Sequence, residues 1–278
     1  MDKRRLGVIA TALVYHGAAS AAAPTAAEPP ASQPASYVFA TELGSGVYDV
    51  SGRTLLVYRL PFSYALRAAS ADAPGLNLTL PAAVGFFNYS PIDIVHSQLP
   101  SHLDAVSFVP GLQLDYKLDE HWHVLPYARA GASFASADFD GWLYGLGTTN
   151  TYKWYTHGFE ARVLNDVLFA GVIYKDSRVA NDNLVRLRNG VELRRGTGVT
   201  LGQHEIELSV YGFADYFADA PRPPLAGTRA SHLQFEPGFM IGALPPWQVH
   251  GVPMPRLGIG YRFAGDLSGW HLVISTPF

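Results

Sequence analysis

The chain contains no cysteine among its 278 residues. This absence excludes disulfide bonds and also excludes a lipid anchor attached through a cysteine side chain. It is compatible with an oxidising compartment, but it does not by itself identify one.

Charged residues are scarce and long apolar runs are missing. Charged residues make up 15% of the chain and aromatic residues 13%, whereas a typical soluble domain is about 25% charged. No segment beyond residue 21 approaches the roughly 18 consecutive apolar residues of a membrane-spanning helix. A chain that is apolar on average but never in blocks is typical of strands in which every second residue meets lipid. The net charge of −3 gives no reason to expect a nucleic-acid partner.

The first residues, Met1–Ala21, have the three parts of a secretory signal peptide. Residues 3–5 are basic, Leu6–Tyr15 is a short apolar run, and Ala19–Ala21 is a small-x-small cleavage site. The apolar run is too short to span a bilayer as a helix. We therefore expect export and removal of residues 1–21.

A segment rich in alanine, proline and serine follows at residues 22–36. Its prolines oppose a stable helix, and it has too few large apolar side chains to form a core. We expect a disordered periplasmic leader, with a single β-domain over residues 37–278.

From Tyr37 onward the chain alternates between apolar and polar residues. In the clearest segment, 105–119, leucines and aromatics share one face, while serine, glutamine, aspartate and lysine share the other. Such period-two patterns predict strands. The predicted strands are 37–50, 54–67, 76–89, 105–119, 123–135, 153–165, 167–176, 184–194, 204–217, 231–244, 255–264 and 269–278.

Connection lengths favour an antiparallel transmembrane β-barrel of about twelve strands. Bacterial barrels combine short periplasmic turns with longer outer loops and an even number of strands. The predicted outer loops are 90–104, 136–152, 177–183 and 218–230, and the predicted periplasmic turns are 68–75, 119–122, 165–167, 195–203 and 245–254. Ten strands remain possible if 37–50 and one weak segment fail.

The polar face of these strands carries charges of both signs. A soluble β-sandwich would also alternate, but it would turn this polar face toward water. In a barrel the same face lines the interior, and twelve strands leave a narrow lumen. The predicted lumen-lining residues are Arg59, Asp115, Lys117, Glu160, Arg162, Arg186, Glu207, Glu236 and Arg262.

The last ten residues form one amphipathic strand. Trp270, Leu272, Ile274 and the terminal Phe278 lie on one face. Trp270 and Phe278 are about 26 Å apart along a strand. A tilt of about 40° reduces this distance to about 20 Å of height, which fits the apolar band of an outer-membrane barrel. The segment resembles the C-terminal signal strand that the bacterial barrel-assembly machinery recognises.

The chain also resembles the translocator barrels of bacterial autotransporters. Residues 122–131, with an apolar-Pro-Tyr step leading to glycine, resemble a recurring strand of that family, and residues 261–265 with 269–278 resemble its closing hairpin. Only the Pro/Ala-rich leader precedes the barrel, so the closer resemblance is to solitary barrels without a passenger domain. The resemblance implies a location in the Gram-negative outer membrane, in contact with outer-membrane lipids and lipopolysaccharide.

Function is less well defined by the residues. We expect a narrow, porin-like pore or transport role with an unidentified solute. The alternative is a structural barrel that binds lipopolysaccharide or partners through its outer loops. A lipid hydrolase is a third possibility, but the histidines lie in no recognisable nucleophile motif. His121 and His123 are too few for a metal site, and we expect no catalytic residues, metal or cofactor.

Overall fold

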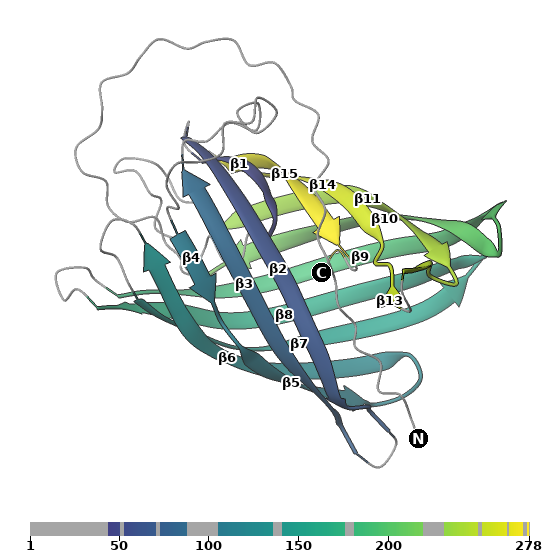
Figure 1. Ribbon diagram of the computed structural model, residues 1–278, viewed down its shortest axis with the longest axis horizontal. Helices are drawn as coiled ribbons and strands as arrows, with labels where there is room; N and C mark the ends of the chain where they lie inside the picture. Colours follow the sequence, from purple (N-terminus) through teal and green to yellow (C-terminus); the bar gives the residue numbers. More distant parts are fainter. Residues whose placement is uncertain are drawn as a thin grey trace, which may run out of the picture.

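The computed structural model describes residues 44–50, 53–70, 73–87, 105–135, 141–175, 181–218, 231–249, 252–265, 267–274 and 277. The predicted signal peptide, the predicted leader and Phe278 lie outside these residues. The described residues form an antiparallel β-barrel (Figure 1).

The barrel wall has twelve strands, one of which is interrupted. β4 (Ala105–Phe108) and β5 (Gly111–Lys117) both pair with β3 and β6, so they are two halves of one strand. The other strands are β1 (Gly46–Val50), β2 (Arg53–Arg67), β3 (Gly75–Phe87), β6 (Trp122–Ala135), β7 (Gly141–Thr156), β8 (Phe159–Tyr174), β9 (Asp182–Leu201), β10 (His204–Phe217), β11 (Leu233–Leu244), β14 (Leu257–Ala264) and β15 (Leu267–Ile274).

Each of these strands pairs with the next along the chain, and the two ends meet. The barrel closes where β1 pairs with β15, with Gly46 opposite His271 and Val50 opposite Leu267. Neighbouring strands therefore satisfy each other's backbone hydrogen bonds around the circle, and no open edge remains at this seam. The prediction of a twelve-stranded antiparallel barrel is confirmed.

The interruption between β4 and β5 is caused by Pro110, which has no N–H to donate. The adjacent backbone groups still find partners. The N–H of Val109 donates to the carbonyl of Pro81 (3.1 Å), and the carbonyl of Pro110 accepts from Ala130 (3.0 Å). The strand therefore bends without breaking the wall of the barrel.

The predicted loop 136–152 and the predicted turn 165–167 are wrong. β7 begins at Gly141, and residues 165–167 lie in the middle of β8. The turn lies instead at His157 and Gly158, whose φ values of 48° and 79° are those of a tight type I′ hairpin turn.

The glycines of β7 explain why the pattern predicts a loop there. A Cβ at position 145 would lie 2.7 Å from Nε of Arg129, and one at position 147 would lie 2.5 Å from the Tyr127 ring. Gly145 and Gly147 therefore leave room for long interior side chains. In sequence, the same glycines are indistinguishable from loop residues.

Two further turns differ from the prediction. β9 continues to Leu201, so only Gly202 and Gln203 join it to β10, in place of the predicted turn 195–203. The predicted turn 245–254 contains a small hairpin, in which β12 (Gln248–Val249) pairs with β13 (Val252–Pro253).

The β5–β6 turn is held by a side chain. The carboxylate of Asp119 accepts hydrogen bonds from the backbone N–H groups of His121 and Trp122, both at 2.7 Å. These donors stabilise the charged form, so they lower the pKa of Asp119 below its ordinary value.

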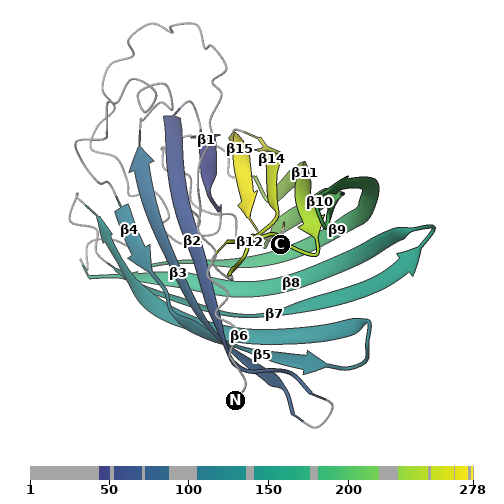
Figure 2. The same ribbon diagram turned by 45° about the vertical axis from the view of Figure 1, so that its right-hand side comes forward.

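The outer wall is apolar over a limited height. On β7, Trp142 is 59% exposed and Tyr152 is 44% exposed. These residues are ten positions apart, or about 33 Å along the strand, which a tilt of about 40° reduces to about 25 Å. Figures 1 and 2 show the strands tilted in this way, with the hairpin ends of β7–β10 extending beyond their neighbours. Among the described residues, no helix is long and apolar enough to cross a membrane.

Candidate site in the barrel interior

Charged side chains alternate with apolar ones along the strands, and they occupy the opposite side of the wall. On β9, Leu187, Val191 and Leu193 are 39–45% exposed, whereas Arg186 and Glu192 are 5% and 2% exposed. A closed wall has only an outer and an inner face, so the buried charged face is the interior. A buried charge needs a partner, because the protein interior solvates it poorly.

The first interior cluster, which we call the central network, consists of Asp166, Arg186, Arg188, Asp215, Glu236 and Arg262. Asp215, which has no exposed surface, accepts two parallel hydrogen bonds from Arg188, at 2.6 and 2.7 Å. Arg186 lies 3.9 Å from the same carboxylate and 2.7 Å from Asp166. Paired, planar contacts of this kind are the strongest that arginine makes with a carboxylate.

Glu236 forms the other half of the central network. Its carboxylate accepts hydrogen bonds from Nε of Arg262 (2.9 Å) and from the Tyr211 hydroxyl (3.0 Å), and it lies 2.6 Å from Nδ1 of His271. Arg262 also approaches Asp215 at 3.8 Å, so it joins the two carboxylates. The Phe213 ring lies beneath the guanidinium groups of Arg188 and Arg262, at 4.1 and 5.1 Å.

The second cluster lies nearer the β7–β8 and β9–β10 turns. This turn-side network consists of Glu160, Arg162, Glu192, Arg194, Glu207 and Arg256. Arg194 bonds Glu160 and lies 3.4 Å from Glu207. Arg256 donates to Glu192 at 2.5 Å and lies 3.6 Å from Glu207. Three arginines and three glutamates thus balance each other across β8, β9, β10 and the residue that precedes β14.

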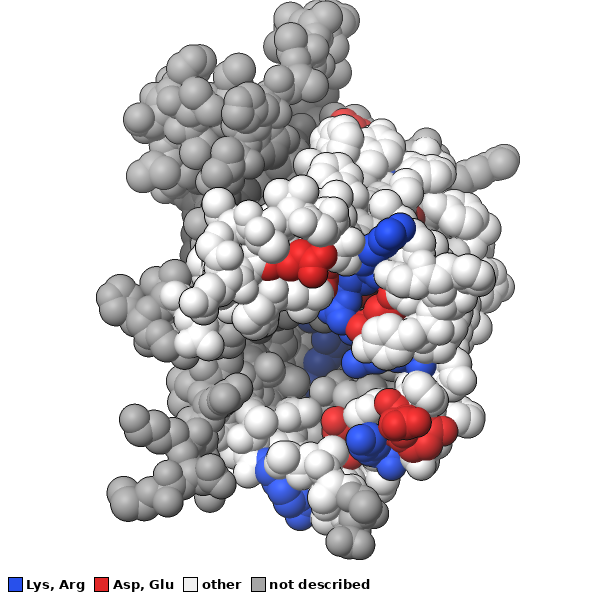
Figure 3. All heavy atoms as spheres, turned by 90° about the vertical axis from the view of Figure 1, so that its right-hand side faces the viewer, with Lys and Arg blue, Asp and Glu red and all other residues white. Residues whose placement is uncertain are grey.

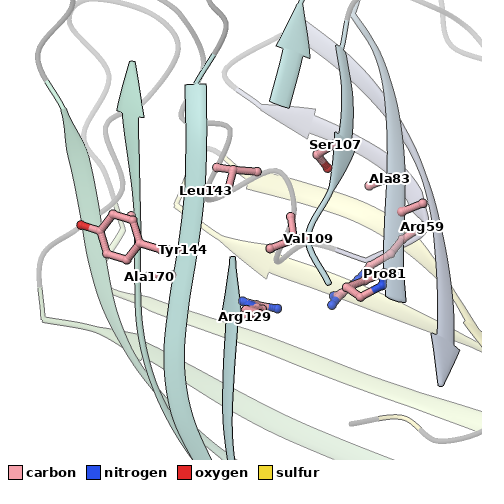
Figure 4. Close-up of a pocket in the computed structure, with 11 residues that line it drawn as sticks. Arg59, Pro81, Ala83, Ser107, Val109, Arg129, Leu143, Tyr144 and Ala170 are labelled. Atoms are coloured by element: carbon pink, nitrogen blue, oxygen red, sulfur yellow. The ribbon is translucent and has the colours of Figure 1, made fainter. Parts of the chain in front are cut away.

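On the opposite wall, a pocket that we call the β2–β6 pocket contains two arginines, and its lining extends to residues of β7 and β8. The pocket is lined by Arg59 and Arg129 together with Ser107, Val109 and others. In Figure 4 the side chains of Arg59 and Arg129 converge below Val109, whereas Tyr144 points away from them. The strand register explains the space. Arg59 is followed around the wall by Ala83, Ser107, Ser133 and Gly141, none of which has a long side chain.

The charged groups are visible from one end of the barrel. Figure 3 looks along the direction in which the β7–β10 hairpins extend, and it shows Lys, Arg, Asp and Glu side chains gathered around a hollow between rims of other residues. This arrangement can hold water and ions inside a wall whose outer face is apolar.

Comparisons with known proteins agree with this architecture. No protein-family model matches the chain, and no curated protein matches it significantly. Among solved structures, the beta domain of the Bordetella autotransporter BrkA has a TM-score of 0.51 and 11% sequence identity, over 82% of this chain and 93% of that chain. The chain has the fold of an autotransporter beta domain. The NanC porin, with a TM-score of 0.41 and 12% identity over 84% and 97% of the two chains, is too distant to support an argument.

Within this autotransporter-type barrel, the predicted lumen-lining residues occupy several places. Glu160, Arg162 and Glu207 belong to the turn-side network, and Arg186, Glu236 and Arg262 belong to the central network. Arg59 lies apart from both, in the β2–β6 pocket. Asp115 and Lys117 join neither network among the described contacts. Asp115 lies 2.8 Å from Nδ1 of His123, and Lys117 is exposed at the end of β5.

The residues proposed as an assembly signal belong to β15. Trp270 is half-exposed on the outer face, and Leu272 and Ile274 follow it at alternate, partly buried positions. Val273, between the last two, is buried. Phe278 lies outside the described residues.

The predicted list of lumen-lining residues leaves out six members of the two networks: Asp166, Arg188, Glu192, Arg194, Asp215 and Arg256. Asp166 falls within the wrongly predicted turn 165–167. The signal for Arg188, Glu192 and Asp215 is present, because each occupies the polar phase of its predicted strand. Alternation does not identify the residue with which a buried charge pairs. Arg256 and Glu192, for example, form an ion pair although they are 64 positions apart in the chain.

The described residues offer little for the other kinds of chemistry. They contain no group of three or more metal-ligating side chains placed to hold an ion. Among the described residues, a hydroxyl contacts an imidazole where Thr156 lies 2.8 Å from Nδ1 of His157, in an exposed turn. No carboxylate orients that imidazole there, as a catalytic triad would require.

Proposed function

We propose that the protein is an integral β-barrel of the bacterial outer membrane that acts as a narrow pore. The observation that carries this proposal is the division of the wall into an apolar outer face about 25 Å high and a charged inner face. A soluble protein would gain nothing from an exposed belt that contains Trp142, Leu146, Phe239 and Trp270. After export, the C-terminal strand with Trp270, Leu272, Ile274 and Phe278 would guide assembly.

The conducting path would run along the β2–β6 wall. Carboxylates and arginines neutralise each other in the central and turn-side networks and fill the space beside β8–β15. The pocket on the other side presents Arg59 and Arg129 among small residues. The charged groups beside a narrow passage set its ion selectivity, so these two guanidinium groups are expected to influence it.

Conductance in a planar bilayer tests this proposal. We expect small single-channel steps and, in a salt gradient, a reversal potential that reports the ion selectivity of the pore. Arg129→Gln removes one positive charge from the path, so it should shift the reversal potential toward greater cation preference. The matched control is Arg195→Gln, which removes a positive charge from an exposed residue of β9 that packs on Phe159. An equal shift in both variants would contradict the assigned path.

A structural barrel that acts through its outer segments is the second candidate. It is favoured by the burial of Asp215, Glu236 and Arg262 in the central network, which are at most 2% exposed. In that case the inserted protein would give no conductance steps. Deletions in the segments 90–104, 136–140 or 218–230 would then abolish binding to lipopolysaccharide or cells while the barrel still assembles.

A further inference from the structure

One row of polar residues interrupts the apolar outer wall. Asn150 of β7 pairs in register with Asn165 of β8, which pairs in turn with Asn189 of β9. We call these three residues the asparagine row. All three alternate in phase with outward residues such as Tyr152, Val167 and Val191, so they belong to the outer face.

Most of the residues around the row are apolar, with Thr148 of β7 as a polar neighbour of Asn150. Along β9, Asn189 lies between Leu187 and Val191, which are both exposed. Around the barrel, the row ends at Val124 of β6, opposite Asn150, and at Ala214 of β10, opposite Asn189. The row is therefore a line of amides within the belt, with Asn189 near its middle and Asn150 next to Tyr152 at its edge.

The amides are only partly satisfied within the described part of the chain. The Asn165 amide donates to the side-chain carbonyl of Asn189 at 2.6 Å, and both residues are exposed. The described contacts include no hydrogen bond from the Asn150 side chain. Each amide has two N–H donors and a carbonyl with two lone pairs, so most hydrogen-bonding groups of the row face outward. Hydrocarbon cannot form hydrogen bonds with these groups, and polar groups left unsatisfied inside the bilayer are costly.

The chemistry of the row identifies a suitable occupant. It contains no charge, so it does not match an ionic headgroup. Amides are both donors and acceptors, so a second asparagine row is a complementary partner. A two-fold axis parallel to the barrel axis keeps the depth of every residue unchanged, so each amide row meets the other at the same depth, with Asn165 facing its own copy. On β10, Ala214 opposite Asn189 and Gly212 opposite Val191 are small and allow close approach.

We propose that the outer face of β7–β9 is the surface through which two copies of this chain associate in the membrane, with the asparagine row at its centre. This inference rests on the membrane location given in the proposed function, but it does not depend on conduction. The pairing satisfies the outward amide groups without exposing them to lipid.

Cysteine cross-linking tests the interface directly, because the natural chain has no cysteine. Asn165→Cys, reconstituted in lipid vesicles, should form a disulfide-linked dimer on mild oxidation. The control is Phe239→Cys, at an exposed outward position on β11, away from the row. The control should give less than a tenth of the dimer yield. Equal yields at both positions, or a monomer at every protein-to-lipid ratio, would overturn the proposal.

A triple variant separates association from folding. Asn150→Leu, Asn165→Leu and Asn189→Leu together should lower the dimer fraction at least tenfold, while the barrel still inserts and keeps its heat-dependent shift on a denaturing gel. If the row only stabilised the sheet, the triple variant would lose barrel stability and keep its association, which would contradict the interface. A chain that dimerises but does not conduct would refute the pore and leave the interface standing. A chain that never inserts would refute both.

Discussion

At the scale of single residues, glycines in the wall make room for tyrosines in the interior. The Tyr211 ring lies over Gly238 and Gly260 while its hydroxyl bonds Glu236. Tyr48 lies in the same way over Gly46 and Gly269. These glycines are not needed for an unusual backbone conformation. They are needed because a neighbouring side chain occupies the space of their Cβ.

Gly260→Ala tests this packing. The new Cβ would lie 2.2 Å from the Tyr211 hydroxyl and 2.6 Å from Oε1 of Glu236. Tyr211 cannot move aside without giving up its bond to the buried carboxylate. We expect a loss of about 1–3 kcal/mol in the free energy of unfolding, as for other overpacked sites, measured by urea unfolding in vesicles.

The control for this change lies on the neighbouring wall. Gly212→Ala places its Cβ 3.9 Å from the nearest heavy atom, the carbonyl oxygen of Glu236. This is an ordinary contact, so the unfolding midpoint should stay within error of the natural protein. A similar loss in both variants would mean that the cost comes from replacing glycine in a strand and not from contact with Tyr211.

At the scale of elements, the β7–β8 hairpin depends on two residues with positive φ. Gly158, with a φ of 79°, adopts a conformation that costs a side-chain-bearing residue about 1–2 kcal/mol. Gly158→Val should therefore destabilise the barrel by at least this amount and slow the formation of the hairpin. His157→Asn should be neutral or slightly stabilising, because asparagine is favoured at the first position of such a turn.

Folding from urea into detergent micelles, followed by tryptophan fluorescence, measures both effects. Trp154, near the end of β7, is close to the turn, so its fluorescence reports on the formation of the hairpin. Unchanged stability in Gly158→Val would indicate that the turn is elsewhere, for example at the residues 165–167 predicted from sequence.

This hairpin also shows where the sequence is informative and where it is not. Strands such as 204–217, for which prediction and structure coincide, alternate without interruption between the two faces. β7 fails because Gly145 and Gly147 are dictated by Arg129 and Tyr127 of the neighbouring strand. A local pattern records which face a residue occupies, but not which distant side chain crosses the space beside it. The same limit hides the partners of Asp166 and Asp215.

At the scale of the whole molecule, closure depends on a short seam. β1 contributes five residues to its pairing with β15, whereas β7 and β8 pair over their full sixteen. The seam is nevertheless reinforced from inside. Tyr48 on β1 is fully buried over Gly269 of β15, and His271 of β15 contacts Glu236 of the central network. The charged interior therefore links the last strand to β11 and β14, beyond its backbone hydrogen bonds.

An engineered disulfide tests whether the chain closes in this register. Asp49 and Ser268 are direct partners across the seam, and opposed residues of antiparallel strands lie about 4.5–5.5 Å apart between Cα atoms, which a disulfide can bridge. Asp49→Cys with Ser268→Cys should oxidise readily and remain a closed loop after heating in detergent, so it should migrate faster on a gel than its reduced form.

Asp49→Cys with Trp270→Cys places the thiols on a diagonal of about 7–8 Å, beyond the reach of an unstrained bridge. Oxidation of the diagonal pair alone would show that β1 and β15 meet two residues out of this register, and oxidation of neither pair in an inserted, heat-modifiable protein would show that they do not close the barrel.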